Sequence, residues 1–206
     1  MSNILTLVEV APTGVPADST AGLLAAAAAL GTPVAVVAVA PGAGGELAPV
    51  LGALGAAHVL VAESAEVGRT LAAPQLAALD AAVERFSPAA VLLSHSIESR
   101  DVAARFSVRA DGALAIDAVG VRLDGDRVIA QHSVFGGAYS TESLVEGGLP
   151  VITLRQGAVQ ERAAAASPEV ATVAVAVTGP TISNCAGQSR GSSSSVMPSP
   201  RIPCGE

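Results

Sequence analysis

The chain contains no lysine and no tryptophan, and aromatic residues make up only 2% of its 206 positions. All 11 basic residues are therefore arginines, and they face 18 acidic residues, which leaves a net charge of −7. A protein that binds nucleic acid needs a basic stripe to neutralise phosphates, and docking on an anionic membrane surface needs the same. The charge balance therefore argues against both kinds of partner.

Long hydrophobic runs and cysteines are also scarce. The sequence lacks an uncharged apolar run of about 18 residues, so we expect no transmembrane helix. The start, Met1-Ser2-Asn3, lacks the basic region and cleavage site of a signal peptide, so we expect a cytoplasmic protein. Cys185 and Cys204 both lie near the C-terminus and are not spaced as a metal site. We expect both thiols to stay reduced.

The chain is rich in apolar residues: half of all positions are hydrophobic and only 14% are charged. In the first half, short runs typical of strands alternate with helical patterns. Strands that are apolar throughout are buried on both faces, as in a parallel sheet covered by helices. The alternation predicts an open α/β sheet with right-handed crossovers. The expected strands are 4–10, 33–39, 58–62 and 89–93, and the expected helices are 18–30, 47–54, 74–86 and 97–109.

The alternation of strand-like runs and helical patterns stops after residue 112. Strand-like runs follow at 116–123, 128–134, 138–145, 150–154 and 170–177, with turn residues at 124–126 and 136–137. We therefore predict one domain over residues 1–177, with a mostly antiparallel second half. The predicted fold class is α/β: an open, mostly parallel sheet flanked by helices, Rossmann-like and similar to that of adenine-nucleotide hydrolases, with an added β-rich second half.

The composition breaks at Thr178. The last 29 residues, 178–206, hold seven serines, four prolines and four glycines, with few large apolar side chains. Such a segment cannot bury enough surface to offset the entropy of ordering it, so we predict a disordered tail. A native Ser-rich tail and translation in a shifted frame both explain the change, and composition does not separate them.

Ser94-His95-Ser96 is the segment that most invites a catalytic interpretation. It lies where a predicted strand passes into a helix, and the carboxyl ends of strands line the ligand crevice in open α/β sheets. A serine beside a histidine suggests a nucleophile and its base. However, sequence neighbours rarely reach each other in these roles, and the Gly-x-Ser-x-Gly turn is missing. We favour a polar turn whose hydroxyl caps the following helix.

Other candidates have simpler structural interpretations. Gly42 to Gly45 follows the second strand with the wrong spacing for a dinucleotide fingerprint, and the first strand-to-helix turn, 11–14, lacks one. His58 and His132 lack partners at ligand spacing. The segment 98–101 (Glu-Ser-Arg-Asp) places acids where they favour a helix N-terminus. We therefore predict no catalytic, cofactor-binding or metal-binding residue.

Several strings, taken in order, resemble the N-terminal domain of the electron transfer flavoprotein alpha subunit. These strings are the first strand at 4–10, the strand at 58–62, the strand at 89–93 with the helix string 99–105, the Phe-Gly-Gly-Ala turn at 135–138, and the closing segment 148–155. The resemblance covers residues 3–177 and rests on order and spacing. One departure is clear. The family usually has Arg-Pro before the aromatic turn, where this chain has His132-Ser133.

The resemblance implies a heterodimer with a beta subunit that accepts electrons from flavin dehydrogenases and carries them on FAD. It implies that FAD belongs mainly to a C-terminal domain of the alpha subunit, whose Gly- and Arg-rich flavin motif this chain lacks. An AMP or similar nucleotide, where present, belongs to the beta subunit. None of the family's flavin-contacting residues can therefore be assigned here. This domain would act as scaffold and subunit interface, and would bind FAD weakly or not at all.

Two alternatives remain open at this stage. One is a nucleotide-binding α/β protein of the universal-stress type, which would need a Gly-rich phosphate loop that we do not find. The other is a structural partner that binds a beta subunit without any cofactor. If the family interpretation is right, an apolar patch should be exposed where partners pack, because large exposed patches mark interfaces.

Overall fold

The computed structural model describes residues 2–177. The expected tail and both cysteines lie outside the described residues. The helices are α1 (Thr20–Leu30), α2 (Leu47–Ala53), α3 (Ala73–Phe86), α4 (Ile97–Arg109) and the 3₁₀ turn η1 (Phe135–Gly137). The strands are β1 (Asn3–Leu7), β2 (Thr32–Val39), β3 (His58–Glu63), β4 (Ala90–Ser94), β5 (Ala113–Asp124), β6 (Arg127–Val134), β7 (Tyr139–Leu144), β8 (Pro150–Leu154) and β9 (Glu169–Ala174).

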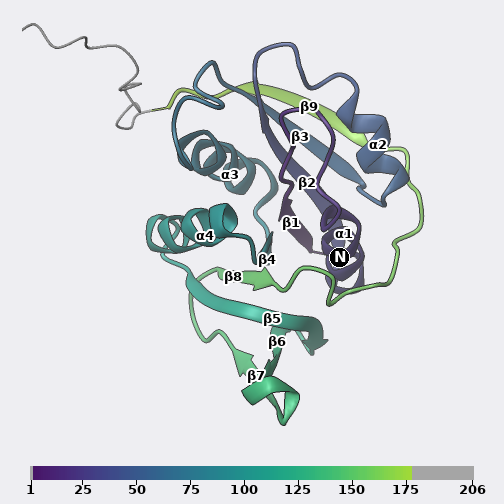
Figure 1. Cartoon of the computed structure of the whole chain (residues 1–206), viewed down its shortest axis with the longest axis vertical. Coiled ribbons are helices and arrows are strands. Elements are labelled where there is room, and N and C mark those ends of the chain that lie inside the picture. Colours follow the sequence, from purple (N-terminus) through teal and green to yellow (C-terminus); the bar gives the residue numbers. More distant parts are fainter. Residues whose placement is uncertain (1, 178–206) are drawn as a thin grey trace, which may run out of the picture.

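All nine strands belong to one sheet, in the order β7-β6-β5-β8-β4-β1-β2-β3-β9 (Figure 1). The first four strands pair in parallel, with β1 between β2 and β4. This confirms the open α/β fold class. Helix α4 has the predicted bounds, and the other first-half elements differ from prediction by a few residues at their ends. Within the described residues, none of the helices combines the length and apolar character needed to cross a bilayer.

The second half differs from the prediction in its pairing. Strands β5, β6 and β7 form the expected antiparallel meander. However, β8 inserts in parallel between β4 and β5, and β9 pairs in parallel with β3 at the far edge. A mostly antiparallel second half is therefore wrong for β8 and β9. Four of the five residues of β8 are buried, which suits an interior strand, because such a position is covered on both faces.

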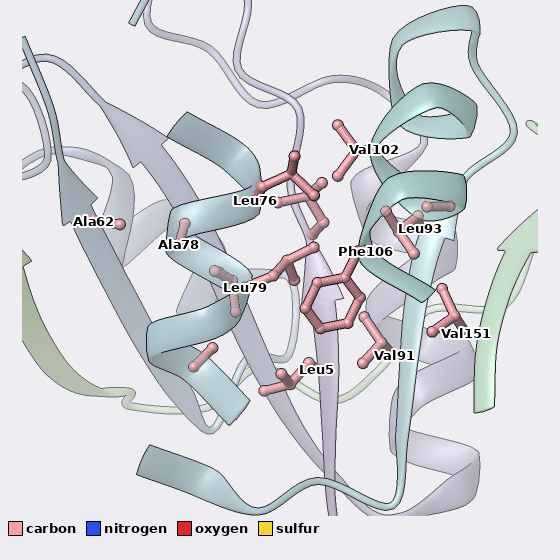
Figure 2. Packing of buried hydrophobic residues seen from close by; sticks show 14 of the residues in the cluster. Leu5, Ala62, Leu76, Ala78, Leu79, Val91, Leu93, Val102, Phe106 and Val151 are labelled. Carbon is pink, nitrogen blue, oxygen red and sulfur yellow. The ribbon is translucent and has the colours of Figure 1, made fainter. Parts of the chain in front are cut away.

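The hydrophobic core lies on both faces of the sheet. Helices α3 and α4 pack on one face, and α1 and α2 pack on the other. Figure 2 shows the α3–α4 side, where the ring of Phe106 lies among Leu5, Leu79 and Val91. Phe106 is the largest fully buried side chain, and its core neighbours are Ala, Val and Leu. The small alanines on α3 let that helix approach the sheet closely.

A long strap, residues 155–168, connects β8 to β9 and crosses α1 and α2 on the way (Figure 1). It touches α1 at Gly22, where an added Cβ would lie 2.5 Å from the carbonyl oxygen of Val159. It is tied to α2 by the Ala166 N–H, which donates to the Gly52 carbonyl at 2.8 Å. The two glycines therefore let the strap lie against the helices, and the strap brings β9 to the edge beside β3.

Candidate functional site: the carboxyl-end crevice and the β6–β7 tip

The sheet reverses its winding between β1 and β4, since β1 leads to α1 on one face and β4 leads to α4 on the other. Open α/β sheets bind ligands at the carboxyl ends of strands beside such a switch point. A cleft of about 430 Å³ opens there. The ends of β1 and β2 and the first turns of α3 and α4 line it. This cleft is called the crevice below.

Glu9, just after β1, organises the crevice wall. Its Oε1 accepts a hydrogen bond from the Ser99 hydroxyl at 2.6 Å and another from the Ser96 hydroxyl. The Ser96 oxygen in turn accepts the Ser99 backbone N–H at 3.0 Å, which makes Ser96 the N-cap of α4. The predicted capping role of the Ser-His-Ser segment is therefore confirmed at Ser96. The partner at Glu9 is a feature that the sequence did not signal.

The other members of that segment have structural partners. Ser94 is fully buried and its oxygen accepts from the Gln156 amide at 3.0 Å. His95 Nδ1 lies 2.9 Å from Thr153 Oγ1, and its Nε2 lies 3.9 Å from Asp117 Oδ1. The spatial arrangement of Thr153, His95 and Asp117 resembles a catalytic relay. However, Thr153 is fully buried and its hydroxyl also accepts the Asp117 N–H, so no substrate reaches that hydroxyl. The nucleophile interpretation is not supported.

Arg155, just after β8, and Asp117 in β5 form an ion pair. The guanidinium donates to both carboxylate oxygens, at 2.9 and 2.7 Å, and also to the Ser133 carbonyl at 3.3 Å. The hydrogen bond from Arg155 lowers the pKa of Asp117. Asp117 has a left-handed φ of 57° at the irregularity in β5. The pair therefore ties β8, β5 and β6 together, and the arginine's charge is already matched.

The crevice offers carboxylates where a nucleotide would place phosphates. Glu9 and Glu98 both line it, and its lining includes no arginine. Gln75 Nε2 donates to Glu98 at 2.8 Å. A backbone donor of the glycine loop after β2 already has a carboxylate partner, because the Gly42 N–H donates to the Glu63 carboxylate at 2.9 Å. Like charges repel, so this crevice does not suit a phosphate. Gly42 and Gly45 are exposed, so this segment is a surface loop.

A second cleft, of about 650 Å³, lies between the start of α1 and the strap. Arg155 and Arg162 line it, together with Asp18. A flavin dinucleotide carries a pyrophosphate, which needs free cations or backbone N–H groups. Arg155 is already paired with Asp117, so Arg162 is the cation that this cleft leaves for an anion, and the Asp18 carboxylate in the same lining opposes one.

The remaining histidines are bound to structural partners. His58 Nδ1 lies 3.4 Å from the Glu169 carboxylate, and its ring packs on Phe86 with centroids 5.7 Å apart. His132 Nε2 lies 2.6 Å from the Ser143 hydroxyl. In the described part of the chain, His, Cys, Asp and Glu do not gather in any group of three that could hold a metal ion. Both histidines join neighbouring strands.

An exposed aromatic pair marks the end of the β6–β7 hairpin. Phe135 and Tyr139 are 84% and 64% exposed. Their rings meet edge to face with centroids 5.8 Å apart. In the sequence, the Phe-Gly-Gly turn supports a family resemblance but does not indicate that its rings form an exposed surface. The chain has only four aromatic residues, and two of them lie together on this tip.

These features define a class of protein: an open α/β domain with an antiparallel hairpin extension, a switch-point crevice without a phosphate site, and an exposed aromatic tip. The electron transfer flavoprotein domain model matches residues 4–178. The chain belongs to that family. It is 39% identical over 175 residues to an electron transfer flavoprotein subunit alpha of Mycobacterium tuberculosis, and 37% identical to one of Mycobacterium leprae.

Each of these two matches covers 85% of this chain and 54% of the relative. A subunit alpha of Syntrophomonas wolfei is 30% identical over 144 residues, which are 69% of this chain and 45% of the relative. The chain thus spans about half the length of the relatives it matches. It is an alpha-type N-terminal domain, as the sequence resemblance indicated.

Proposed function

We propose that this domain is the scaffold and subunit interface of an electron transfer flavoprotein alpha-type subunit. In this role it joins a beta-type subunit to form an FAD-dependent electron carrier that accepts electrons from flavin dehydrogenases. The observation that carries the proposal is the family match, which spans the described domain from β1 to the end of β9. The site geometry supports a binding role over a catalytic one, because each polar group of the Ser-His-Ser segment serves the fold.

We further propose that residues 1–177 form the alpha-type domain and residues 178–206 a separate tail, in a cytoplasmic protein. The flavin domain that the resemblance implies would correspond to the half of the relatives that this chain does not match. The nucleotide sequence downstream of codon 178 tests the origin of the tail. A second reading frame that encodes a Gly-rich, Arg-containing continuation supports a frameshift, and the lack of one makes the tail native.

The isolated chain is expected to bind FAD weakly or not at all. The crevice carries Glu9 and Glu98, and the Arg155 guanidinium in the neighbouring cleft is already paired. Titration of FAD into the purified chain by calorimetry, with flavin fluorescence as a second readout, tests this. Binding at micromolar affinity or tighter contradicts it. A universal-stress-type nucleotide protein is not proposed, since the acidic lining opposes phosphate.

Purification tests the function as a whole. The isolated chain should be colourless, should give no calorimetric signal with ATP, and should capture the beta-type subunit of the same organism when the two are co-expressed. Flavin absorbance in that complex supports the FAD-dependent carrier, and a complex without it favours the structural partner that binds a beta subunit without a cofactor. A colourless protein that binds ATP and ignores the beta-type subunit contradicts the proposal and favours the nucleotide-binding alternative.

A further inference from the structure

The tip presents its aromatic rings in a strained backbone. Phe135 has a φ of 51°, in the left-handed region that side chains other than glycine rarely adopt. Gly136 and Gly137 continue in the same region, with φ values of 66° and 93°. A strained non-glycine residue persists where the surrounding structure imposes it, and such residues cluster at binding sites. Here the strain holds a large apolar ring mostly in solvent, where its aromatic partner is the equally exposed Tyr139 ring.

The chemistry of the tip is that of an interface core. Residues 133–141 contain no charged side chain. Protein interfaces are enriched in Phe and Tyr at their centres and depleted of charge there. Within residues 2–177, strand β7 is also an edge strand, because it pairs with β6 alone. Such an edge leaves backbone N–H and C=O groups free to pair with another chain.

The position of the tip separates it from the end of the described chain. Strand β7 lies at one edge of the nine-stranded sheet and β9, which leads to residue 177, lies at the other (Figure 1). Eight strand spacings separate the two edges, which is roughly 40 Å along the sheet. The described chain ends beside β3, at the opposite edge of the sheet from the tip, so a segment that continues the same polypeptide would have to cross the sheet to reach the tip. The tip is therefore better placed for a different polypeptide.

We infer that the Phe135–Tyr139 tip is the anchor with which this domain docks into an uncharged, apolar pocket on the beta-type subunit. The inference rests on the proposed function and specifies the contact. Two buried aromatic side chains supply on the order of 300–500 Å², whereas a stable interface buries about 800 Å² per partner. The tip is thus the centre of a larger contact surface.

The test compares affinities for the purified beta-type subunit by calorimetry. One variant carries Phe135→Ala and Tyr139→Ala. The matched control carries Ile97→Ala and Val108→Ala, which remove two apolar side chains of α4 that are 83% and 82% exposed. We expect the tip variant to bind at least about 30-fold more weakly, the loss typical of an interface hot spot, and the control to bind as wild type does. Circular dichroism and melting temperature verify that all three proteins are folded.

The outcomes separate the inference from the proposed function. If wild type, tip variant and control all bind the beta-type subunit within threefold, the tip is not the anchor and the proposed function stands. If the wild-type chain does not bind the subunit, the proposed function fails and the inference fails with it. If the tip variant abolishes self-association of the chain but leaves beta-subunit binding intact, the occupant is a second copy and the inference is overturned.

Discussion

Replacing Gly22 with alanine tests whether the strap lies against α1 as described. Gly22 is a helix residue, and glycine in a helix is normally less stable than alanine by about 1 kcal/mol. Propensity alone therefore predicts that the variant is stabilised. At this site, however, the new Cβ would lie 2.5 Å from the Val159 carbonyl oxygen and 3.4 Å from the Val159 Cβ. Because the obstructing atom belongs to the backbone, the strap itself must shift.

Overpacking typically costs about 1–3 kcal/mol, and a backbone oxygen at 2.5 Å places this site in the upper part of that range, at about 2–3 kcal/mol. After the helix gain of about 1 kcal/mol, the net effect of Gly22→Ala is a loss of roughly 1–2 kcal/mol. For a domain of this size that lowers the melting temperature by about 2–8 °C. Gly45→Ala is the matched control, because its Cβ would have no atom within 4 Å. Thermal unfolding by circular dichroism measures both. A Gly22→Ala variant that melts at or above the wild-type temperature would refute the described strap contact.

Three further predictions follow from particular side chains. Phe106→Ala should lower the free energy of unfolding by about 3–5 kcal/mol in urea denaturation, with Phe86→Ala, at a half-buried ring, losing clearly less. Asp117 has a pKa below its ordinary value of 3.8, so its pair with Arg155 stabilises the fold above that pH and is lost as pH falls through the lowered pKa. Asp117→Asn should flatten the acid side of a stability–pH curve, and an unchanged curve contradicts this role. Phe135→Gly relieves the left-handed strain but also removes the edge-to-face contact with Tyr139, and the two contributions are of similar size. The free energy of unfolding should therefore change by no more than about 1 kcal/mol, while beta-subunit binding weakens. A clear loss of stability in that variant contradicts the strain argument.

The first half of the fold could be predicted because its signals are local. The apolar runs and the helix patterns between them need no knowledge of distant residues, and the polar cap that precedes α4 is equally local. The pairing of β8 and β9 could not be predicted. An apolar run such as 150–154 specifies burial but not which strands lie beside it. The position of β9 depends in addition on where the strap carries the chain.

The site could be predicted only in part, because most of its contacts join residues that are far apart in the sequence. The capping role of Ser96 is local and was found, whereas the Glu9 carboxylate that binds it is 87 positions away in the sequence. The Arg155–Asp117 pair depends on a left-handed residue within an irregular strand, which no sequence pattern indicated. The tip was noted as a string but not as a surface, because exposure of an aromatic residue cannot be judged from its neighbours in the chain.

The central claim is that this domain is a subunit-binding scaffold of an electron transfer flavoprotein. The mass of the species formed when the purified chain is mixed with the beta-type subunit, measured by light scattering after gel filtration, tests it most directly. The account predicts one peak whose mass is the sum of one chain and one beta-type subunit. Two peaks at the separate masses, at concentrations of tens of micromolar, would contradict it.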